Sequence, residues 1–268
     1  MIKLIASDMD GTLLNDRKEL PGDFFEVFDE LERRGIKFTV ASGRSFDAVA
    51  HLFPEEYRTR LDFICDNGAN VIHEGKQVSV TPLDRPTFEQ LIRACEDIGG
   101  LRILVCAGRG TYRLTADAEF SAEIAKYYKN HIPCDDLLSV DDVIYKLAVC
   151  DMKGTQQHAK PAIDAIFGDR LNVQVSGPIW MDIMGAGVSK GSALRALGKH
   201  LGISAEDTMA FGDFYNDADM LKYAGWSFAM ENGNPDIKRM TRFLARSNNE
   251  NGVLRAIRKY ALQEDSIK

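Results

Sequence analysis

The sequence has few prolines and no polar tracts, the features that would disrupt a packed core. It contains 8 prolines among 268 residues, has no low-complexity tract, and is 45% apolar. Chains that stay disordered are poor in apolar residues and rich in polar tracts, so this composition excludes disorder. The length suits one large domain or two ordinary ones, and either arrangement can bury a sizeable core.

A long apolar run is also absent. No segment approaches the roughly 18 uncharged apolar residues that a membrane-spanning helix needs. The apolar stretch at the N-terminus stops at Asp8, which is too early for the core of a signal peptide. We therefore expect a cytoplasmic protein that has no membrane partner.

An excess of positive charge is the third absence. The 33 Lys and Arg residues are outnumbered by 40 Asp and Glu residues, for a formal net charge of -7. Proteins that bind nucleic acids neutralise phosphates with clustered Lys and Arg, so we expect no nucleic-acid partner. A small phosphorylated metabolite is compatible, because it needs positive charge only at its own site. A monomer and a small homo-oligomer both stay open.

Paired cysteines are missing as well. The five cysteines are odd in number and widely spaced, and none has the spacing of a metal site or a disulfide motif. We interpret them as small core residues in a reducing compartment. They are Cys65, Cys95, Cys106, Cys134 and Cys150.

Strand and helix patterns alternate at both ends of the chain. Residues 2–6 are typical of a buried strand, and Phe24, Phe28 and Leu31 follow at helical spacing. The same alternation continues to residue 65 and resumes over residues 190–261. It predicts an α/β fold with a doubly wound, Rossmann-like parallel sheet that helices cover.

The pattern in the middle of the chain is different. It predicts helices mixed with antiparallel strands, including a hairpin around residues 107–110 and a helix around Phe120 to Tyr128. We therefore predict an inserted α+β domain over residues 82–184. The core would be made of residues 1–81 and 185–268.

Four polar clusters follow predicted strands or begin a predicted helix. In a doubly wound sheet, ligands bind outside the carboxyl ends of the strands. The clusters are Asp8-Met9-Asp10-Gly11-Thr12, Ser42-Gly43-Arg44, Ser189-Lys190-Gly191 and Gly212-Asp213-Phe214-Tyr215-Asn216-Asp217.

Each cluster by itself has an ordinary explanation. Asp10 can belong to a turn, Ser42 can cap the helix that follows, and Lys190 can be a solvated surface charge. The two aspartates of the last cluster can be a turn residue and a helix-start residue. Together, and in this order, the clusters supply what phosphoryl transfer needs: a nucleophile, a proton carrier, positive charge and a metal site.

The first cluster offers two carboxylates that suit different roles. Asp8 is the candidate nucleophile, because a carboxylate can attack phosphorus to form an aspartyl phosphate and so divide one difficult displacement into two. Asp10 can protonate the leaving-group oxygen and later deprotonate the attacking water.

The other clusters offer charge and metal ligands. An anionic phosphate repels a carboxylate nucleophile, so we expect Mg²⁺, a hard cation that binds carboxylates, phosphate oxygens and water. Asp8 and Asp213 are the expected carboxylate ligands. Lys190 supplies a positive point charge, while Ser42 and backbone N–H groups near Gly43 can bind the remaining phosphate oxygens.

These motifs resemble those of a known family. The sequence is similar over nearly its whole length to the haloacid dehalogenase-like phosphatases, and within them to the Cof-type branch of cytoplasmic phosphohydrolases. DMDGTL at Asp8, ASGR around Ser42, GVSKG around Lys190 and GDFYND at Asp213 stand in the family's order. The NGA segment at residues 67–69 and the long insertion also look like this branch, in which the insertion is an α+β cap domain.

The resemblance implies a role for each matched residue. Asp8 would be the nucleophile and a metal ligand, and Asp10 the acid/base whose main-chain carbonyl also binds Mg²⁺. Lys190 would be the third catalytic residue and would hold phosphate together with Ser42. The remaining assignments are Asp213 and Asp217 to the metal, and Thr12, Gly43, Arg44 and Asn216 to the phosphate site.

The expected reaction is hydrolysis of a small phosphomonoester, a sugar phosphate or a similar metabolite, beneath the cap. Two alternatives stay open. A phosphomutase of the same superfamily would use the same aspartyl phosphate but return the group to a sugar. A non-catalytic regulator that binds metabolites would keep the fold without turnover, although a pure binder has no need of Asp10 beside Asp8.

Overall fold

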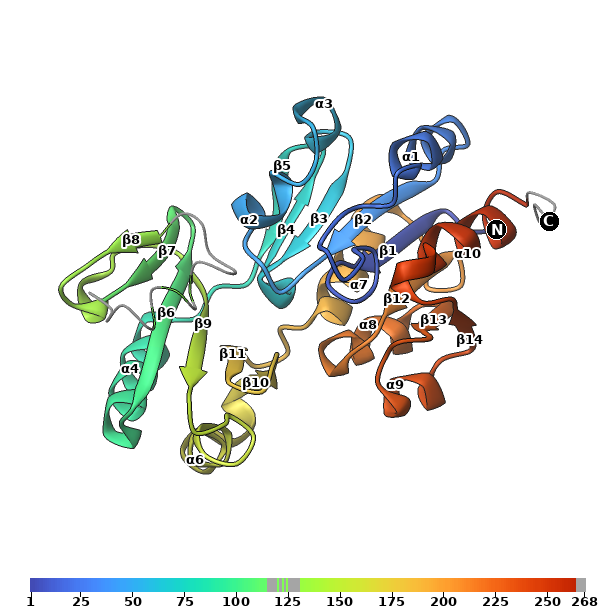
Figure 1. The fold of residues 1–268 in the computed structure, drawn as a ribbon. Helices are drawn as coiled ribbons and strands as arrows, with labels where there is room; N and C mark the ends of the chain where they lie inside the picture. The colour runs from blue at the N-terminus through green and yellow to red at the C-terminus, as the bar shows by residue number, and fades with distance from the viewer. Residues whose placement is uncertain (115–119, 121, 123, 125–130, 264–268) are drawn as a thin grey trace.

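The computed structural model describes residues 1–114, 120, 122, 124 and 131–263. Its strands form two sheets, one built from both ends of the chain and one from the middle. Figure 1 shows the middle segment, in green to yellow, to one side of the larger sheet. None of the helices in the described part is long and apolar enough to cross a membrane.

The larger sheet has eight strands in the order β14-β13-β12-β1-β2-β3-β4-β5. The strands from β14 to β3 run parallel, whereas β4 pairs antiparallel with both β3 and β5. The bounds are β1 Leu4–Asp8, β2 Lys37–Ala41, β3 Asp62–Cys65, β4 Asn70–His73, β5 Lys76–Val80, β12 Thr208–Gly212, β13 Trp226–Met230 and β14 Phe243–Ala245.

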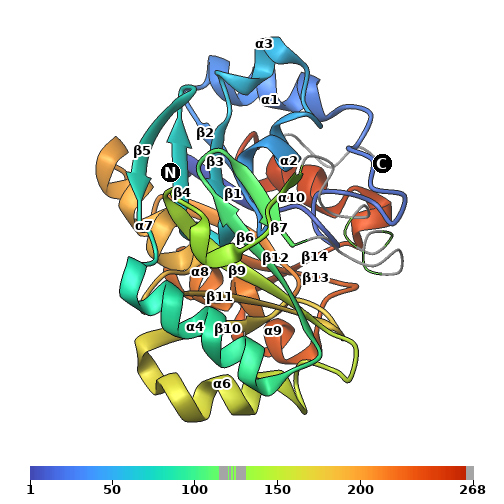
Figure 2. The same ribbon diagram turned by 90° about the vertical axis from the view of Figure 1, so that its left-hand side faces the viewer.

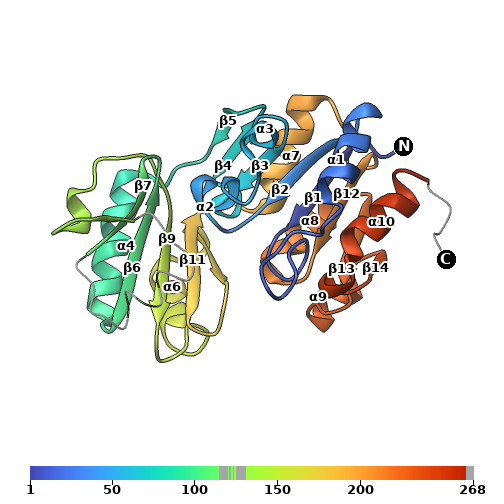
Figure 3. The same ribbon diagram turned by 45° about the horizontal axis from the view of Figure 1, so that its top comes forward.

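Helices cover both faces of this sheet, because successive strand residues point to opposite sides. Ile5 lies in an apolar cluster with α1 and α10, and its neighbours Leu4 and Ala6 lie in another cluster with α7, α8 and α9. Figure 3 shows α10 and α7 separated by the strands. The helices are α1 Phe24–Arg33, α2 Phe46–Ala50, α3 Glu55–Arg58, α7 Lys190–Leu201, α8 Ala218–Tyr223, α9 Pro235–Met240 and α10 Gly252–Tyr260.

The smaller sheet has six strands in the order β10-β11-β9-β6-β7-β8, and each neighbouring pair is antiparallel except β7 with β8. Phe88 of α4 and Ile163 of α6 pack on one of its faces. Figure 2 looks onto this domain, with α4 in front of its strands. The bounds are α4 Arg85–Ile98, β6 Leu101–Ala107, β7 Gly110–Arg113, β8 His131–Pro133, β9 Ile144–Asp151, α6 Ala159–Phe167, β10 Leu171–Val175 and β11 Trp180–Gly185.

The predicted fold class is confirmed: a doubly wound, largely parallel sheet carries an inserted α+β cap. One edge differs from the expectation, since β4 and β5 run antiparallel. Glu74 and Gly75, both with positive φ, form the two-residue turn that lets the chain double back. The helix expected around Phe120 to Tyr128 lies largely outside the described residues. The domain boundaries at residues 81 and 184 stay a prediction.

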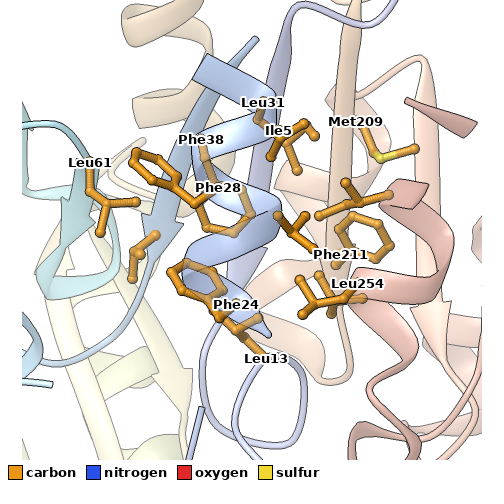
Figure 4. Close-up of a cluster of buried hydrophobic side chains, with 14 of the residues drawn as sticks. Ile5, Leu13, Phe24, Phe28, Leu31, Phe38, Leu61, Met209, Phe211 and Leu254 are labelled. Atoms are coloured by element: carbon orange, nitrogen blue, oxygen red, sulfur yellow. The ribbon is translucent and has the colours of Figure 1, made fainter. Parts of the chain in front are cut away.

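Phe24 lies at the centre of the cluster between α1 and the sheet. It is 1% exposed, and its ring centroid lies 5.5 Å from that of Phe38 and 6.3 Å from that of Phe28. Figure 4 shows the three rings packed beside Leu13 and Leu61.

We expect Phe24→Ala to lower the free energy of unfolding by about 3–5 kcal/mol, because the lost ring leaves a cavity that the surrounding side chains cannot fill. Urea unfolding measures this loss. Leu244→Ala is the control: Leu244 is 63% exposed on β14, and its loss should change stability by less than about 0.5 kcal/mol. Equal effects of the two substitutions would contradict the assignment of Phe24 to the core.

Candidate active site

The cap meets the larger sheet at the carboxyl ends of its parallel strands. β1 ends at Asp8, β12 ends directly before Asp213, and Ser42 follows β2. Because β12, β1 and β2 are parallel neighbours, these residues lie at one edge of the sheet. The cap reaches this edge, since Lys146 Nζ of β9 donates to the main-chain oxygen of Gly43 at 2.7 Å.

Lys190 holds two aspartates together. Its completely buried Nζ donates to Asp8 Oδ1 at 2.5 Å and to Asp217 Oδ1 at 2.7 Å. Lys190 is the first residue of α7, whose start is fixed by a capping box. Ser189 Oγ accepts from the Ser192 N–H, and Ser192 Oγ accepts from the Ser189 N–H, both at 3.0 Å. The local sequence thus sets the point from which the lysine reaches the carboxylates.

Burial and charge shift the pKa values of this group. Burial raises the pKa of Asp8 well above the usual carboxyl value, which Lys190 only partly offsets, and Asp217 and Asp213 add to the rise. Burial and Asp217 also raise the pKa of Asp213 to about 6. Burial by itself would lower the pKa of Lys190, but Asp217 and Asp8 outweigh it and raise that pKa. The ammonium group is therefore charged near neutral pH.

Three carboxylates form a candidate metal centre. Asp8, Asp213 and Asp217 each offer an oxygen within 4.8 Å of the other two. Thr12 Oγ1 donates to Asp213 Oδ1 at 3.1 Å, which orients that carboxylate. Gly11 has a φ of 81°, and a Cβ there would lie 2.6 Å from Asp213 Oδ2, so glycine is required. The donors are all oxygens, which suits a hard divalent cation.

Two cations hold Asp10. Arg44 donates through Nε to Asp10 Oδ2 at 2.9 Å and through a terminal nitrogen to Oδ1 at 2.7 Å, and Lys18 Nζ donates to Oδ1 at 2.8 Å. Burial acts to raise the pKa of Asp10, but Arg44 and Lys18 outweigh it and the pKa is lowered. Asp10 is therefore ionised here, and Arg44, which we expected at the phosphate, contacts a carboxylate instead.

Two other predicted phosphate ligands, Ser42 and Asn216, also have hydrogen-bond partners at the site. Ser42 Oγ accepts from the backbone N–H of Arg44 at 3.1 Å. Asn216 Nδ2 donates to Asn67 Oδ1 at 3.3 Å, and Asn67 Nδ2 donates in turn to Asp182 Oδ2 at 2.8 Å. Asn216 is thus linked to β11 of the cap through one intervening side chain.

A buried ion pair on the cap was missed by the sequence interpretation. Lys146 Nζ lies 2.6 Å from Asp182 Oδ1, and these side chains are 1% and 7% exposed. The sequence left Asp182 without a role and did not single out Lys146. The sequence did hold a sign of this ion pair, because Lys146 is the one charged residue in the stretch 144–150. A lysine inside a buried strand needs a carboxylate partner.

Comparison with known proteins identifies the family. The model of the haloacid dehalogenase-like hydrolases matches residues 5–257. The chain belongs to this family. It is 31% identical over 265 residues to 5-amino-6-(5-phospho-D-ribitylamino)uracil phosphatase YbjI of Escherichia coli K12, covering 98% of this chain and 97% of that protein.

Two further proteins are similar to this haloacid dehalogenase-like hydrolase over most of their length. HMP-PP phosphatase of Klebsiella pneumoniae is 28% identical over 239 residues, which cover 89% of this chain and 87% of that protein. The crystal structure of SMU.1108c from Streptococcus mutans UA159 has a TM-score of 0.89 and 28% identity, covering 98% of this chain and all of that one (100%). The predicted family and enzyme class, a hydrolase of phosphoric monoesters, are confirmed.

The hydrolase has another buried carboxylate next to this site. Asp66 follows β3 directly and is completely buried, and neither of its side-chain oxygens has a hydrogen-bond partner in the part of the chain that the structure describes. Asp66 and Asn67 both have left-handed backbones, with φ of 51° and 53°. Burial raises the pKa of Asp66 to about 7, and Lys146 only partly opposes the rise.

We expect Lys190→Met in the hydrolase to lower the free energy of unfolding by about 3–5 kcal/mol, because it leaves the buried carboxylates of Asp8 and Asp217 without a counter-charge. The measurement is urea unfolding in the presence of a chelator. Adding Asp217→Asn to this variant should recover part of the loss, since one negative charge is removed. If Lys190→Met were as stable as the starting protein, the ammonium would not hold the site together.

We expect Asp66→Asn to gain stability relative to the starting protein as the pH rises from about 4 to about 8. Folded Asp66 keeps its proton up to about pH 7, whereas an unfolded aspartate loses it near pH 4. The folded state therefore binds more protons between these values, and the stability contributed by Asp66 at low pH is lost as the pH rises. Urea unfolding should show the difference growing by about 2–4 kcal/mol. A difference that did not vary with pH would contradict the raised pKa.

Proposed function

We propose that this hydrolase cleaves small phosphomonoesters through a phosphorylated Asp8 and that it needs Mg²⁺. The contact of Lys190 with both Asp8 and Asp217 is the observation that carries the proposal. An aspartate that only closed a turn would be exposed to water, whereas Asp8 is buried against a buried cation. Charges buried in this way are costly and concentrate at functional sites.

The reaction would proceed in two half-reactions. An Asp8 oxygen attacks phosphorus, the bond from phosphorus to the ester oxygen breaks, and the leaving oxygen takes a proton from Asp10. A water molecule then attacks the phosphorus, the bond from phosphorus to the Asp8 oxygen breaks, and Asp10 takes a proton from that water. Inorganic phosphate leaves, and both carboxylates are back in their starting states.

The contacts of Asp10 suggest how substrate binding could cause Asp10 to take up a proton. Arg44 and Lys18 favour its ionised form while no phosphate is bound. A phosphate beside Ser42 would compete with Asp10 for the Arg44 guanidinium, and loss of that contact would raise the pKa of Asp10. We infer that Arg44 leaves Asp10 and binds the phosphate when substrate binds. Arg44 would then be a phosphate ligand, as predicted, in the bound state and a partner of Asp10 in the free state.

The residues that would hold Mg²⁺ are Asp8, Asp213 and Asp217, together with the main-chain oxygen of Asp10 that the resemblance implies. The bound ion would neutralise negative charge on the phosphate and so lessen its repulsion of Asp8. Thr12 keeps the Asp213 carboxylate in place for this role.

The substrate class follows from the relatives. The phosphatases YbjI and HMP-PP phosphatase are both named for small phosphorylated metabolites. We propose the same class here, a sugar phosphate or a similar metabolite. A phosphomutase would also form the phosphorylated Asp8. It would return the phosphoryl group to a sugar, whereas a hydrolase releases inorganic phosphate.

We expect the purified protein to release inorganic phosphate from sugar phosphates with Mg²⁺ and to stop when a chelator is added. Asp8→Asn should reduce the rate by at least about a thousandfold, because the amide is a poor nucleophile. The measurement is phosphate release, combined with an acid quench that traps labelled phosphoenzyme only in the starting protein.

Asp164→Asn is the matched control, since it changes a partly exposed aspartate on α6 that pairs with Lys160 and should leave the rate unaltered. Turnover that survives Asp8→Asn would overturn the mechanism. Transfer to a second sugar position without free phosphate would favour a mutase, and the lack of turnover with any phosphoester would favour a binding protein.

A further inference from the structure

A cavity of about 530 Å³ lies between the core and the cap, and its volume is in the range of small-molecule sites. The core side is formed by α2, β4 and β5, together with Asp66. The cap side is formed by Tyr145 of β9 and by the hairpin between β6 and β7, including Thr111. All of these residues are outside the four motifs, and the proposed reaction uses none of them.

The cavity lies beside the predicted phosphate loop. Its wall begins at Ser45, the residue after Arg44. The Asp66 N–H donates to the main-chain oxygen of Arg44 at 3.0 Å, and the Asn67 N–H donates to that of Ser42 at 3.1 Å. A metabolite whose phosphate lies on this loop can therefore extend its remaining part into the cavity.

Asp66 is the unusual group in the cavity wall. It is completely buried, both of its carboxylate oxygens lack a partner among the described residues, and it has a left-handed backbone. Each of these features costs free energy. A buried polar group without a partner calls for an explanation, and a ligand that completes its hydrogen bonds is one.

The charges around Asp66 indicate what kind of ligand that is. Asp47 also lines the cavity, so two aspartates contribute to its wall. Lys146, whose charge acts on Asp66, contacts Asp182 at 2.6 Å and the Gly43 oxygen at 2.7 Å. His51 adds an imidazole ring at the wall. The surroundings therefore favour a ligand that brings positive charge or N–H donors and disfavour a second phosphate.

The remaining polar groups of the cavity are already ordered. Gln77 Nε2 donates to Asn70 Oδ1 at 2.9 Å and to the Tyr145 hydroxyl oxygen at 3.1 Å. This network joins β4 and β5 of the core to β9 of the cap. These three residues line the cavity together with Asp66.

We propose that this cavity holds the leaving group of the substrate and that Asp66 recognises an amino group on it. The proposal rests on the proposed function and narrows its substrate class to phosphomonoesters that carry an amine or amino substituent. Asp66 is then a specificity-determining residue, separate from the residues that carry out phosphoryl transfer.

The test uses substrate pairs in which an amino group replaces a hydroxyl group. Suitable pairs are glucosamine 6-phosphate with glucose 6-phosphate, pyridoxamine phosphate with pyridoxine phosphate, and phosphoethanolamine with 2-hydroxyethyl phosphate. The readout is kcat/KM for phosphate release at neutral pH. At least one pair should show a preference of about tenfold or more for the amine, because hydrogen bonds to a charged partner are the strong ones. Equal values in every pair would overturn the proposal.

Asp66→Asn should reduce that preference by about tenfold or more, mainly through KM, while Asp66→Glu keeps part of it. Asp47→Asn makes the same change at an exposed position of the cavity wall and should alter the preference less. A preference unaffected by Asp66→Asn would assign recognition to another group and overturn the proposal.

Acetyl phosphate separates this inference from the proposed function, since its leaving group is too short to fill the cavity. If the starting protein hydrolyses acetyl phosphate but shows no amine preference, only the inference fails. If it hydrolyses neither acetyl phosphate nor any substrate of the pairs, the proposed function fails as well.

Discussion

The buried ammonium group of Lys190 is the interaction on which the site depends. Asp8, Asp213 and Asp217 lie close together and away from water, where three carboxylates repel one another. Lys190 contacts two of them and supplies the counter-charge that makes this arrangement possible. Its position is set locally by the capping box at the start of α7 and globally by the packing of α7 on the sheet.

The rest of the structure brings these side chains to one place. Parallel strands end at the same edge of the sheet, so the loops after β1, β2 and β12 meet there. Close approach of the loops requires small residues, and Gly68 is the clearest case because a Cβ there would overlap the Ser189 carbonyl. The cap then closes this edge through Lys146, which binds both Asp182 and the Gly43 carbonyl.

Much of this could be predicted from the sequence because the motifs are local. The segment at Asp8 is a strand followed by a turn, and Ser189 followed by Lys190 is a helix start, as expected. The antiparallel strands β4 and β5 were not foreseen, since both are short and β5, at the edge of the sheet, has no buried residue that would give an apolar pattern. The role of Lys146 was missed because a single charge within a strand does not reveal its partner.

The sequence by itself determined the fold class and the family, and it predicted that the four motifs form one site, because each motif lies where a strand ends or a helix begins. Only the tertiary structure decided which of those residues touch. Arg44 contacts Asp10 across 34 positions, Asn67 contacts Asp182 across 115, and Lys190 contacts Asp8 across 182. Asp66 likewise has no hydrogen-bond partner among the described residues because of the buried surroundings in which the fold places it. Local patterns fix helices and strands, whereas contacts over such separations, and the burial that shifts pKa values, exist only once the chain has packed.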